Sequence, residues 1–223
     1  MRLSVVIPTL DEEVSMRDLL RRLSETPDLH EVIVADGGST DATPDLVRPP
    51  VRFVPCESGR GAQLRAGARQ ATGDVLLFLH ADVVPPRDVA AQIFGAVQAG
   101  CVGGNFRLRY PEGDLLGRWL EVLAPIYRRV PRYYGDSGIF ARCDAYEACG
   151  GIPHIPIMED VIFVERLERM GWTAYLPGPM ISAGRRWKGR ELKTLLLWGS
   201  MQLAFALGAS PWRLSGFYRA RND

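Results

Sequence analysis

Four short apolar runs alternate with helix-like segments in the first half of the chain, and this alternation constrains the fold more than any other feature. The runs are rich in Val, Leu, Ile and Phe and occupy residues 3–8, 31–36, 51–55 and 74–79. Helix-like segments lie at residues 12–25, 43–47, 61–71 and 87–99. Strands without polar alternation are typical of a parallel sheet covered on both faces. The sequence therefore predicts an α/β fold with a mostly parallel sheet flanked by helices on both faces.

The second half of the chain is less regular. It predicts strands at residues 102–110, 135–142 and 172–177 and helices at 144–150 and 158–171. A further helix at 114–130 should break at Pro125, because proline removes a backbone donor. The last residues are helical and partly apolar. We therefore expect one domain at 1–190 with a C-terminal helical extension at 191–223.

Carboxylates follow three of the predicted strands. Asp36 ends the second run, and Glu12 (or its neighbour Asp11) and Asp82 follow the first and fourth runs within a few residues. In open α/β sheets, ligands bind beyond the carboxyl ends of the strands. A single acid at such a place is usually a helix cap or a turn former. Three at one edge repel one another, which favours a bound cation or a hydrogen-bonding ligand.

Two glycine-rich segments and one acidic helix start lie among these strand ends. DGGSTDAT (36–43) and SGRGAQLRAG (58–67) each lead into a helix, and Arg60 in the second suits a phosphate at a helix N-terminus. Neither segment matches GxxxxGK[ST] or GxGxxG, which disfavours a P-loop enzyme and a dinucleotide-binding domain. Glu159 and Asp160 open a helix, where acids favourably face the helix dipole. The alternative is a general base that faces the sheet edge.

The charge is balanced overall but unevenly distributed. The net charge is +1, which argues against a nucleic acid partner bound through its phosphates. From residue 171 onward, however, eight basic residues accompany two acidic ones, so the preceding residues are net acidic. A basic end on an acidic body indicates an anionic partner at one face or a solvated helix face.

The apolar stretch at residues 194–209 is shorter than the ~20 residues that span a bilayer. It could pack on the sheet, form a homodimer interface or dock at a membrane. Trp198, Met201, Leu203 and Phe205 distribute around the helix, which favours packing or dimerisation. The four cysteines form no CxxC pair and are expected to be reduced thiols of a cytoplasmic protein, which leaves open a peripheral position at the inner face of the membrane.

The motifs VVIPTLDEE, VADGGSTDAT, GRGAQLRAG, LHAD, GDSGIF and MEDVIFVERL occur in the order found in family-2 glycosyltransferases of the GT-A fold, and the chain resembles that family over nearly its whole length. Its LHAD, IPIMED and SAGRRW segments are similar to those of small bacterial glycosyltransferases associated with radical-SAM and selenium-domain genes. The resemblance implies transfer of a sugar, with a UDP-sugar favoured as donor. It further implies inversion, with Mg²⁺ or Mn²⁺ as cofactor and an acceptor, small molecule or lipid, whose identity is open.

The resemblance also assigns roles to individual residues. The residues implied to bind the nucleotide are Pro8, Thr9, Glu12, Asp36, Arg60 and Ala81. Asp82 matches the last Asp of the metal-binding DxD motif, with His80 at the first position. Asp160, beside Glu159, matches the catalytic base. The implied acceptor and diphosphate contacts are Gly135, Asp136, Arg185, Arg186 and Trp187.

Three positions depart from the family pattern: His80 replaces an Asp, Ser137 replaces a Gln, and Arg65 stands where the related group has Asn. Two alternatives to sugar transfer therefore stay open. One is a sugar-phosphate nucleotidyltransferase, which the absence of a phosphate loop after the first strand disfavours. The other is a catalytically inactive domain that binds a nucleotide or a membrane surface.

Overall fold

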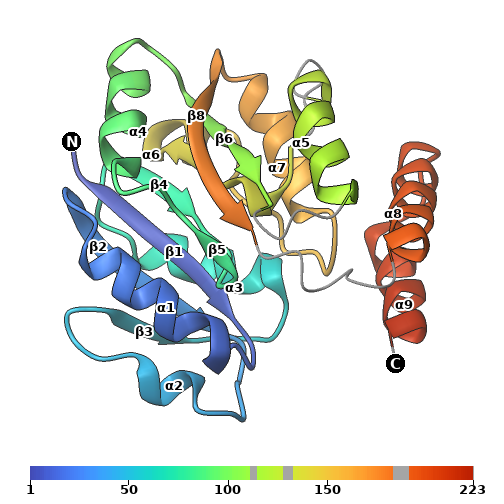
Figure 1. The fold of residues 1–223 in the computed structure, drawn as a ribbon, viewed down its shortest axis with the longest axis horizontal. Coiled ribbons are helices and arrows are strands. Elements are labelled where there is room, and N and C mark those ends of the chain that lie inside the picture. Colours follow the sequence, from blue (N-terminus) through green and yellow to red (C-terminus); the bar gives the residue numbers. More distant parts are fainter. Residues whose placement is uncertain (111–114, 128–132, 183–190, 223) are drawn as a thin grey trace.

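The computed structural model describes residues 1–110, 115–127, 133–182 and 191–222. Its core is one curled sheet with strand order β3-β2-β1-β4-β7-β6-β8-β5 (Figure 1). The strands are β1 (Leu3–Thr9), β2 (Leu29–Asp36), β3 (Arg52–Pro55), β4 (Val75–Phe78), β5 (Val83–Val84), β6 (Gly103–Arg109), β7 (Ile139–Arg142) and β8 (Thr173–Ser182). All four apolar runs of the first half form strands, which confirms the predicted α/β fold.

The first four strands run parallel, and their carboxyl ends reach one edge. Thr9 at the end of β1 pairs with Asp36 at the end of β2, and Asp36 pairs with Pro55 of β3. β7 is antiparallel to both β4 and β6, so β6 runs in the same direction as β4. β8 is parallel to β6 and ends against β5. The second half thus mixes strand directions while keeping the ends of β6 and β8 near the edge formed by β1, β2 and β4.

Helices cover both faces of this sheet. They are α1 (Glu13–Ser24), α2 (Thr43–Leu46), α3 (Arg60–Gln70), α4 (Val89–Gln98), α5 (Leu115–Tyr127), α6 (Cys143–Ala148), α7 (Glu159–Glu168), α8 (Glu191–Ala206) and α9 (Pro211–Asn222), with a 3-10 turn η1 (Gly135–Ser137). α1 and α4 bury Met16 and Ile93 against Val5 and neighbours on one face. α3, α6 and α7 bury residues such as Leu64 and Phe163 on the other. Burial on both faces explains the continuous apolar runs.

Two predictions for the second half need correction. α5 does not break at Pro125 but is helical as far as Tyr127, because the proline removes only one backbone donor from the helix. The strand expected at 172–177 is longer and extends to Ser182, where it pairs with the two-residue strand β5. The sequence did not predict β5, since two residues carry no periodicity.

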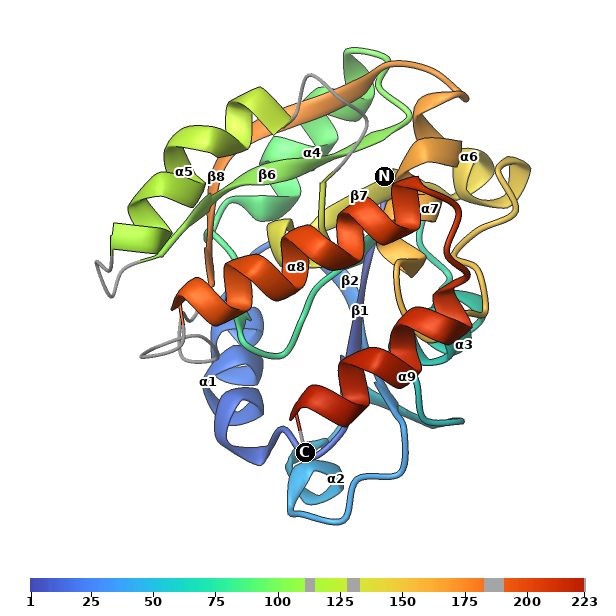
Figure 2. The same ribbon diagram turned by 90° about the vertical axis from the view of Figure 1, so that its right-hand side faces the viewer.

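The predicted C-terminal helical extension consists of α8 and α9. Met201 of α8 and Leu214 of α9 are buried against Met158 and Val161 at the start of α7. Figure 2 shows the two helices crossing the front of the molecule in that view, with the sheet behind them. In the part of the chain that the structure describes, every helix is too short or too polar to cross a membrane.

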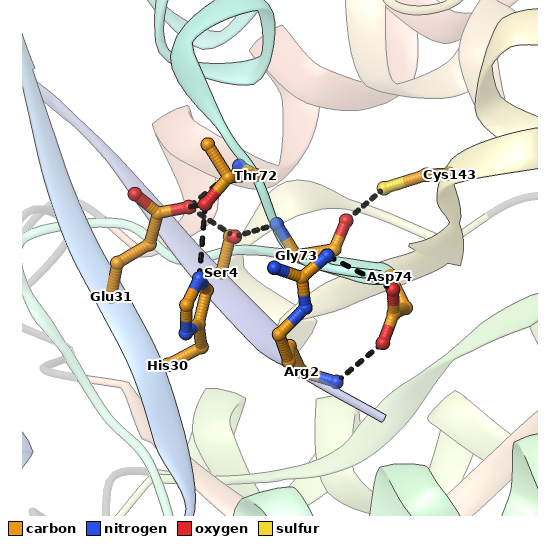
Figure 3. A network of polar contacts seen from close by, with 8 residues as sticks. All are labelled: Arg2, Ser4, His30, Glu31, Thr72, Gly73, Asp74 and Cys143. Atoms are coloured by element: carbon orange, nitrogen blue, oxygen red, sulfur yellow. Dashed lines mark hydrogen bonds and ion pairs between the residues drawn. The ribbon is translucent and has the colours of Figure 1, made fainter.

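The amino ends of the strands carry a separate polar network (Figure 3). One carboxylate oxygen of Glu31 accepts hydrogen bonds from the Ser4 hydroxyl at 2.8 Å and from the Thr72 amide at 2.6 Å. The other accepts from Arg52 of β3 at 2.9 Å. Although desolvation raises it, these donors lower the pKa of Glu31 from 4.5 to about 2. This network joins β1, β2, β3 and the turn before β4 at the end opposite to the predicted site.

Candidate active site

The residues predicted to bind ligands lie on the loops and helix starts that follow the strands. Pro8 and Thr9 end β1, Asp36 ends β2, and His80, Ala81 and Asp82 follow β4. Glu12 precedes α1, and Arg60 opens α3. Gly135 and Asp136 form η1, and Glu159 and Asp160 open α7. Arg185, Arg186 and Trp187 lie outside the described residues.

Asp36 is buried and fully hydrogen-bonded. Oδ1 accepts from the hydroxyls of Thr9, at 2.9 Å, and Ser39. Oδ2 accepts from the amides of Gly38 at 3.0 Å and Ser39 at 2.8 Å. Desolvation raises the pKa of Asp36, but these donors outweigh it and hold the pKa below its usual value. Because four donors use the acceptor positions of the carboxylate, Asp36 shapes the DGGS turn in this state.

The loops after β1 and β2 are joined by further acidic side chains. Asp11 accepts a hydrogen bond from the Thr40 amide at 2.7 Å. Asp41 accepts from the Glu13 amide at 3.0 Å and from the Thr43 amide at 2.9 Å, so it satisfies donors at the starts of both α1 and α2.

Arg60 and Glu159 tie the start of α3 to the start of α7. Arg60 Nε donates to Glu159 Oε1, and the Glu159 side chain is fully buried while the Arg60 side chain is 39% exposed. The start of α3 also packs closely on the start of α7 and the loop before it, because a Cβ on Gly61 would lie 3.3 Å from Glu159 Cβ and 2.8 Å from the Pro153 carbonyl oxygen. Burial raises the pKa of Glu159, which the Arg60 charge opposes. Glu159 thus holds Arg60 at the edge of the site.

Asp160 has different partners from its neighbour. Its Oδ2 accepts from the Gly135 amide at 3.0 Å, and its Oδ1 accepts from the Val161 amide at 2.8 Å. The same glycine packs on His80, because a Cβ on Gly135 would lie only 2.5 Å from His80 Nε2. Residue 135 must therefore be glycine for the imidazole and the Asp160 carboxylate to approach η1 together.

Asp136 is a buried carboxyl group beside these residues. Its Oδ2 accepts from the Tyr110 hydroxyl at 3.2 Å, and its Oδ1 has no hydrogen-bond partner among the described residues. Burial, together with the charges of Asp160 and Asp82, raises the pKa of Asp136 to about 6, despite the Tyr110 bond and the Arg60 charge, which lower it. Asp82, Asp136 and Asp160 therefore form one electrostatically coupled group.

The structure explains one of the family departures, Ser137, and shows the surroundings of a second, Arg65. Ser137 is buried, accepts from Asn105 at 3.0 Å and donates to the Tyr134 carbonyl at 2.6 Å, so it anchors η1 to β6. Arg65 lines a surface cavity of about 400 Å³ on α3 together with Cys56, Arg69 and His154. Neither side chain belongs to the carboxylate group.

The cluster of three carboxylates, Asp82, Asp136 and Asp160, fits a hard divalent cation. Carboxylate oxygens are the ligands that Mg²⁺ and Mn²⁺ prefer, and Asp136 Oδ1 is a buried acceptor without a donor. Within the described ranges no three His, Cys, Asp or Glu side chains are arranged to hold a metal ion by themselves. A Mg²⁺ bound through one or two carboxylates, substrate phosphates and water does not require three.

Two polar contacts of this region were not predicted from the sequence. Tyr110 follows β6, but its place beside Asp136 depends on β6 running parallel to β4, which no local pattern shows. The side chain of Gln63 is buried in α3 and donates to the Thr9 carbonyl at 2.5 Å, which ties α3 to the end of β1. A glutamine three residues into an amphipathic helix is the only sequence signal for it.

The fold and the site define a class: an α/β transferase of the GT-A type, with acidic residues gathered at the carboxyl edge of its first strands. Residues 4–147 match the model of the family described as "Glycosyl transferase family 2", and the chain belongs to this family. It is therefore a glycosyltransferase by family. α7, with Glu159 and Asp160, lies beyond the matched residues.

Curated relatives and solved structures agree with this assignment. The chain is 27% identical to a dolichol-phosphate mannosyltransferase of Pyrococcus furiosus over 58% of this chain and 38% of the relative. It is 32% identical to an undecaprenyl-phosphate 4-deoxy-4-formamido-L-arabinose transferase of Aeromonas hydrophila over 47% of this chain and 36% of the relative. The chain thus spans less than two fifths of the length of either relative.

Among solved structures, the mannosyltransferase PcManGT of Pyrobaculum calidifontis, in complex with GDP-Man and Mn²⁺, aligns with a TM-score of 0.65 at 23% identity. That alignment covers 82% of this chain and 56% of PcManGT. A glucosyl-3-phosphoglycerate synthase of Mycobacterium tuberculosis, in complex with Mn²⁺, UDP and phosphoglyceric acid, aligns with a TM-score of 0.61 at 21% identity, over 94% of this chain and 79% of the synthase. These likenesses establish the GT-A fold.

Proposed function

We propose that the chain transfers a sugar from a nucleotide-diphosphate sugar to an acceptor hydroxyl with inversion at the anomeric carbon. The observation that carries the proposal is the gathering of Asp136, Asp160 and Arg60 where η1, α3 and α7 meet: the Gly135 amide donates to Asp160, and Arg60 pairs with Glu159. The charge of Asp82 also acts on Asp136. Such a group suits a site that holds a cation and a diphosphate beside a general base. UDP is the favoured nucleotide, although neighbours in fold are complexes with GDP-Man as well as UDP.

In this proposal Asp160 is the general base. Each of its oxygens accepts one backbone hydrogen bond, so each keeps a lone pair for the acceptor proton. The acceptor oxygen loses its proton to Asp160 and attacks the anomeric carbon, while the bond from that carbon to the diphosphate oxygen breaks. Attack from the face opposite to the leaving group inverts the anomeric configuration.

The departing diphosphate needs positive charge. Arg60 uses Nε for Glu159 but remains 39% exposed, so its guanidinium can also face the phosphates. Asp82, with His80 as a second candidate, would hold Mg²⁺ or Mn²⁺, which when bound neutralises charge on the leaving diphosphate. Glu159 acts through Arg60 and is a positioning residue. A base contact by Asp36 would require exchange of one of its four hydrogen bonds.

Two chemical classes of acceptor are candidates, a hydroxyl group and a lipid-linked phosphate. A base in the position of Asp160 suits a hydroxyl group. The names of the curated relatives instead include dolichol phosphate and undecaprenyl phosphate, which suggests a lipid-linked phosphate as the second candidate. Transfer to a phosphate would need no base, because a phosphate oxygen is already ionised at neutral pH.

The donor and the metal can be tested together. A thermal-shift screen of UDP- and GDP-sugars with Mn²⁺ should identify one that raises the melting temperature, because a ligand that binds only the folded state stabilises it. Calorimetry with that nucleotide should give an affinity at least about tenfold higher with Mn²⁺ than with EDTA, which is roughly 1.4 kcal/mol of binding free energy.

Asp82→Ala should abolish this Mn²⁺ effect, whereas Asp18→Ala on the exposed surface of α1 should retain it. An affinity that is independent of Mn²⁺ in the wild type, or a Mn²⁺ effect that persists in Asp82→Ala, would contradict the metal assignment. Pyrophosphate release from a nucleoside triphosphate and a sugar phosphate would contradict sugar transfer itself.

A further inference from the structure

The C-terminal helices expose an unusually apolar outer face. Leu196 and Leu203 lie on one stripe of α8, Leu207 directly follows the helix, and the three are 65%, 63% and 79% exposed. On α9, Trp212 is 63% exposed and Phe217 is 49% exposed. Large apolar side chains gathered on one surface usually mark an interaction site, whereas single exposed ones do not. We call these five residues the outer face.

The opposite side of the same helices is anchored to the domain. Met201 and Leu214 are buried against Met158 and Val161, and Gln202 Nε2 lies 3.6 Å from Met158 Sδ. Figure 2 shows α8 and α9 side by side in front of the sheet. The apolar side chains of α8 and α9 are therefore divided between buried residues that pack on the start of α7 and the more exposed residues of the outer face.

Charge identifies the kind of partner that fits the outer face. Residues 192–222 contain Lys193, Arg213, Arg219 and Arg221 but no Asp or Glu. Lys193 and Arg213 are exposed beside the apolar stripe. A symmetric dimer through this face would bring the same basic residues of two copies together with no acid in the segment to pair with them. An anionic surface complements them instead.

We propose that α8 and α9 dock flat on an anionic lipid bilayer, with the outer face in the interface and the basic side chains on the headgroups. Exposed leucines and aromatic rings supply the apolar burial that holds an interfacial helix, and Trp is favoured at this depth. Each basic residue near an anionic surface adds attraction that salt screens. This docking is independent of the proposed reaction.

Docking also bears on where the acceptor is found, and this inference rests on the proposed function. The inner face of α8 contacts Met158, which directly precedes Glu159 and Asp160. Met158 has a φ of 63°, a left-handed conformation that is rare for a side chain of this size. α8 therefore covers a strained residue at the start of the catalytic helix. A bilayer on the outer face would bring the site close to acceptors carried by the membrane.

Vesicle flotation with the full chain tests the docking. The wild type should float with phosphatidylglycerol-containing vesicles at low salt and bind far less at high salt or to pure phosphatidylcholine. Leu203→Glu and Trp212→Glu should each lower the partition coefficient by about tenfold or more, because each removes one buried apolar side chain. The matched control is Trp172→Glu, which changes a 58% exposed Trp before β8 and should leave binding unchanged.

Circular dichroism and the donor-induced thermal shift of each variant separate docking from folding and from donor binding. Loss of flotation with both signals intact supports the proposal whatever the reaction proves to be. The proposal is wrong if the wild type does not bind anionic vesicles, or if Trp172→Glu weakens binding as much as Trp212→Glu. It is also wrong if sedimentation shows a dimer that Leu203→Glu dissociates while vesicles are not bound.

Discussion

Asp36 and Asp136 stand near the same edge of the sheet but ionise differently because their hydrogen bonds differ. Asp36 accepts from four donors, which keep it charged despite burial. Asp136 accepts from Tyr110 alone and lies near Asp82 and Asp160, so its proton is lost only at higher pH. Asp36 takes three of its four donors from the turn that directly follows it, whereas the Thr9 donor of Asp36 and the Tyr110 donor of Asp136 come from distant segments, which the sequence does not reveal.

Asp136→Asn should stabilise the metal-free protein at neutral pH. The pKa of Asp136 is raised from 3.8 to about 6, so the folded state binds more protons than the unfolded state between these values, and stability falls as pH rises through them. The amide removes this cost and should raise the free energy of unfolding at pH 7 by about 1–3 kcal/mol. Chemical denaturation in EDTA would measure the change.

At pH values below the unfolded pKa of 3.8 the carboxyl is protonated in both states, so the stabilisation by Asp136→Asn should vanish there. Asp18→Asn, on the exposed surface of α1, should have no such pH-dependent effect. A gain in stability that is equal at acid and neutral pH would show that packing, and not the charge of Asp136, sets the difference.

At the scale of elements, Glu31 of β2 bonds to Ser4 of β1 and to Thr72 at the end remote from the site (Figure 3), and it also bonds to Arg52 of β3. Its pKa is lowered to about 2, so its contribution to stability is complete above the ordinary value of 4.5 and is lost as pH falls toward 2. Glu31→Gln should lower the free energy of unfolding at pH 7 by about 1–3 kcal/mol and weaken the pH dependence in the acid range.

The comparison for Glu31→Gln is Glu57→Gln, which changes an 82% exposed side chain and should have little effect. Donor binding should be the same in both variants, because the Glu31 network lies at the amino ends of the strands. A loss of donor affinity in Glu31→Gln without loss of stability would mean that the two ends of the sheet are coupled.

The elements that could be predicted from sequence are those fixed by local patterns. The first four strands are continuous apolar runs bounded by turn residues, and α7 shows helical periodicity with an acidic start. β5 and the second half of β8 depend on pairing with each other, about 100 residues apart in the chain. The break predicted at Pro125 was wrong, because the loss of one backbone donor does not end α5.

At the scale of the whole molecule, the order of the sequence motifs indicates the family, and the family model confirms this assignment over residues 4–147. The three-dimensional site needs more than that order. Arg60 pairs with Glu159, and Gly135 with Asp160, only because α3, η1 and α7 meet at one edge. The sequence left three alternatives for the C-terminal helices: packing, a homodimer interface or docking at a membrane. In the structure Met201 and Leu214 pack against the start of α7.

The central claim is that Asp160 accepts the proton of the acceptor during sugar transfer. The most direct measurement compares wild type and Asp160→Asn, with Asp18→Asn as control, for release of nucleoside diphosphate from the stabilising donor in the presence of Mn²⁺. Asp160→Asn should release it at least about 100-fold more slowly, because the amide cannot accept the proton. Its donor Kd should stay within about threefold of wild type, because the base acts on the acceptor. Wild-type turnover by Asp160→Asn, with the donor bound normally, would contradict the account.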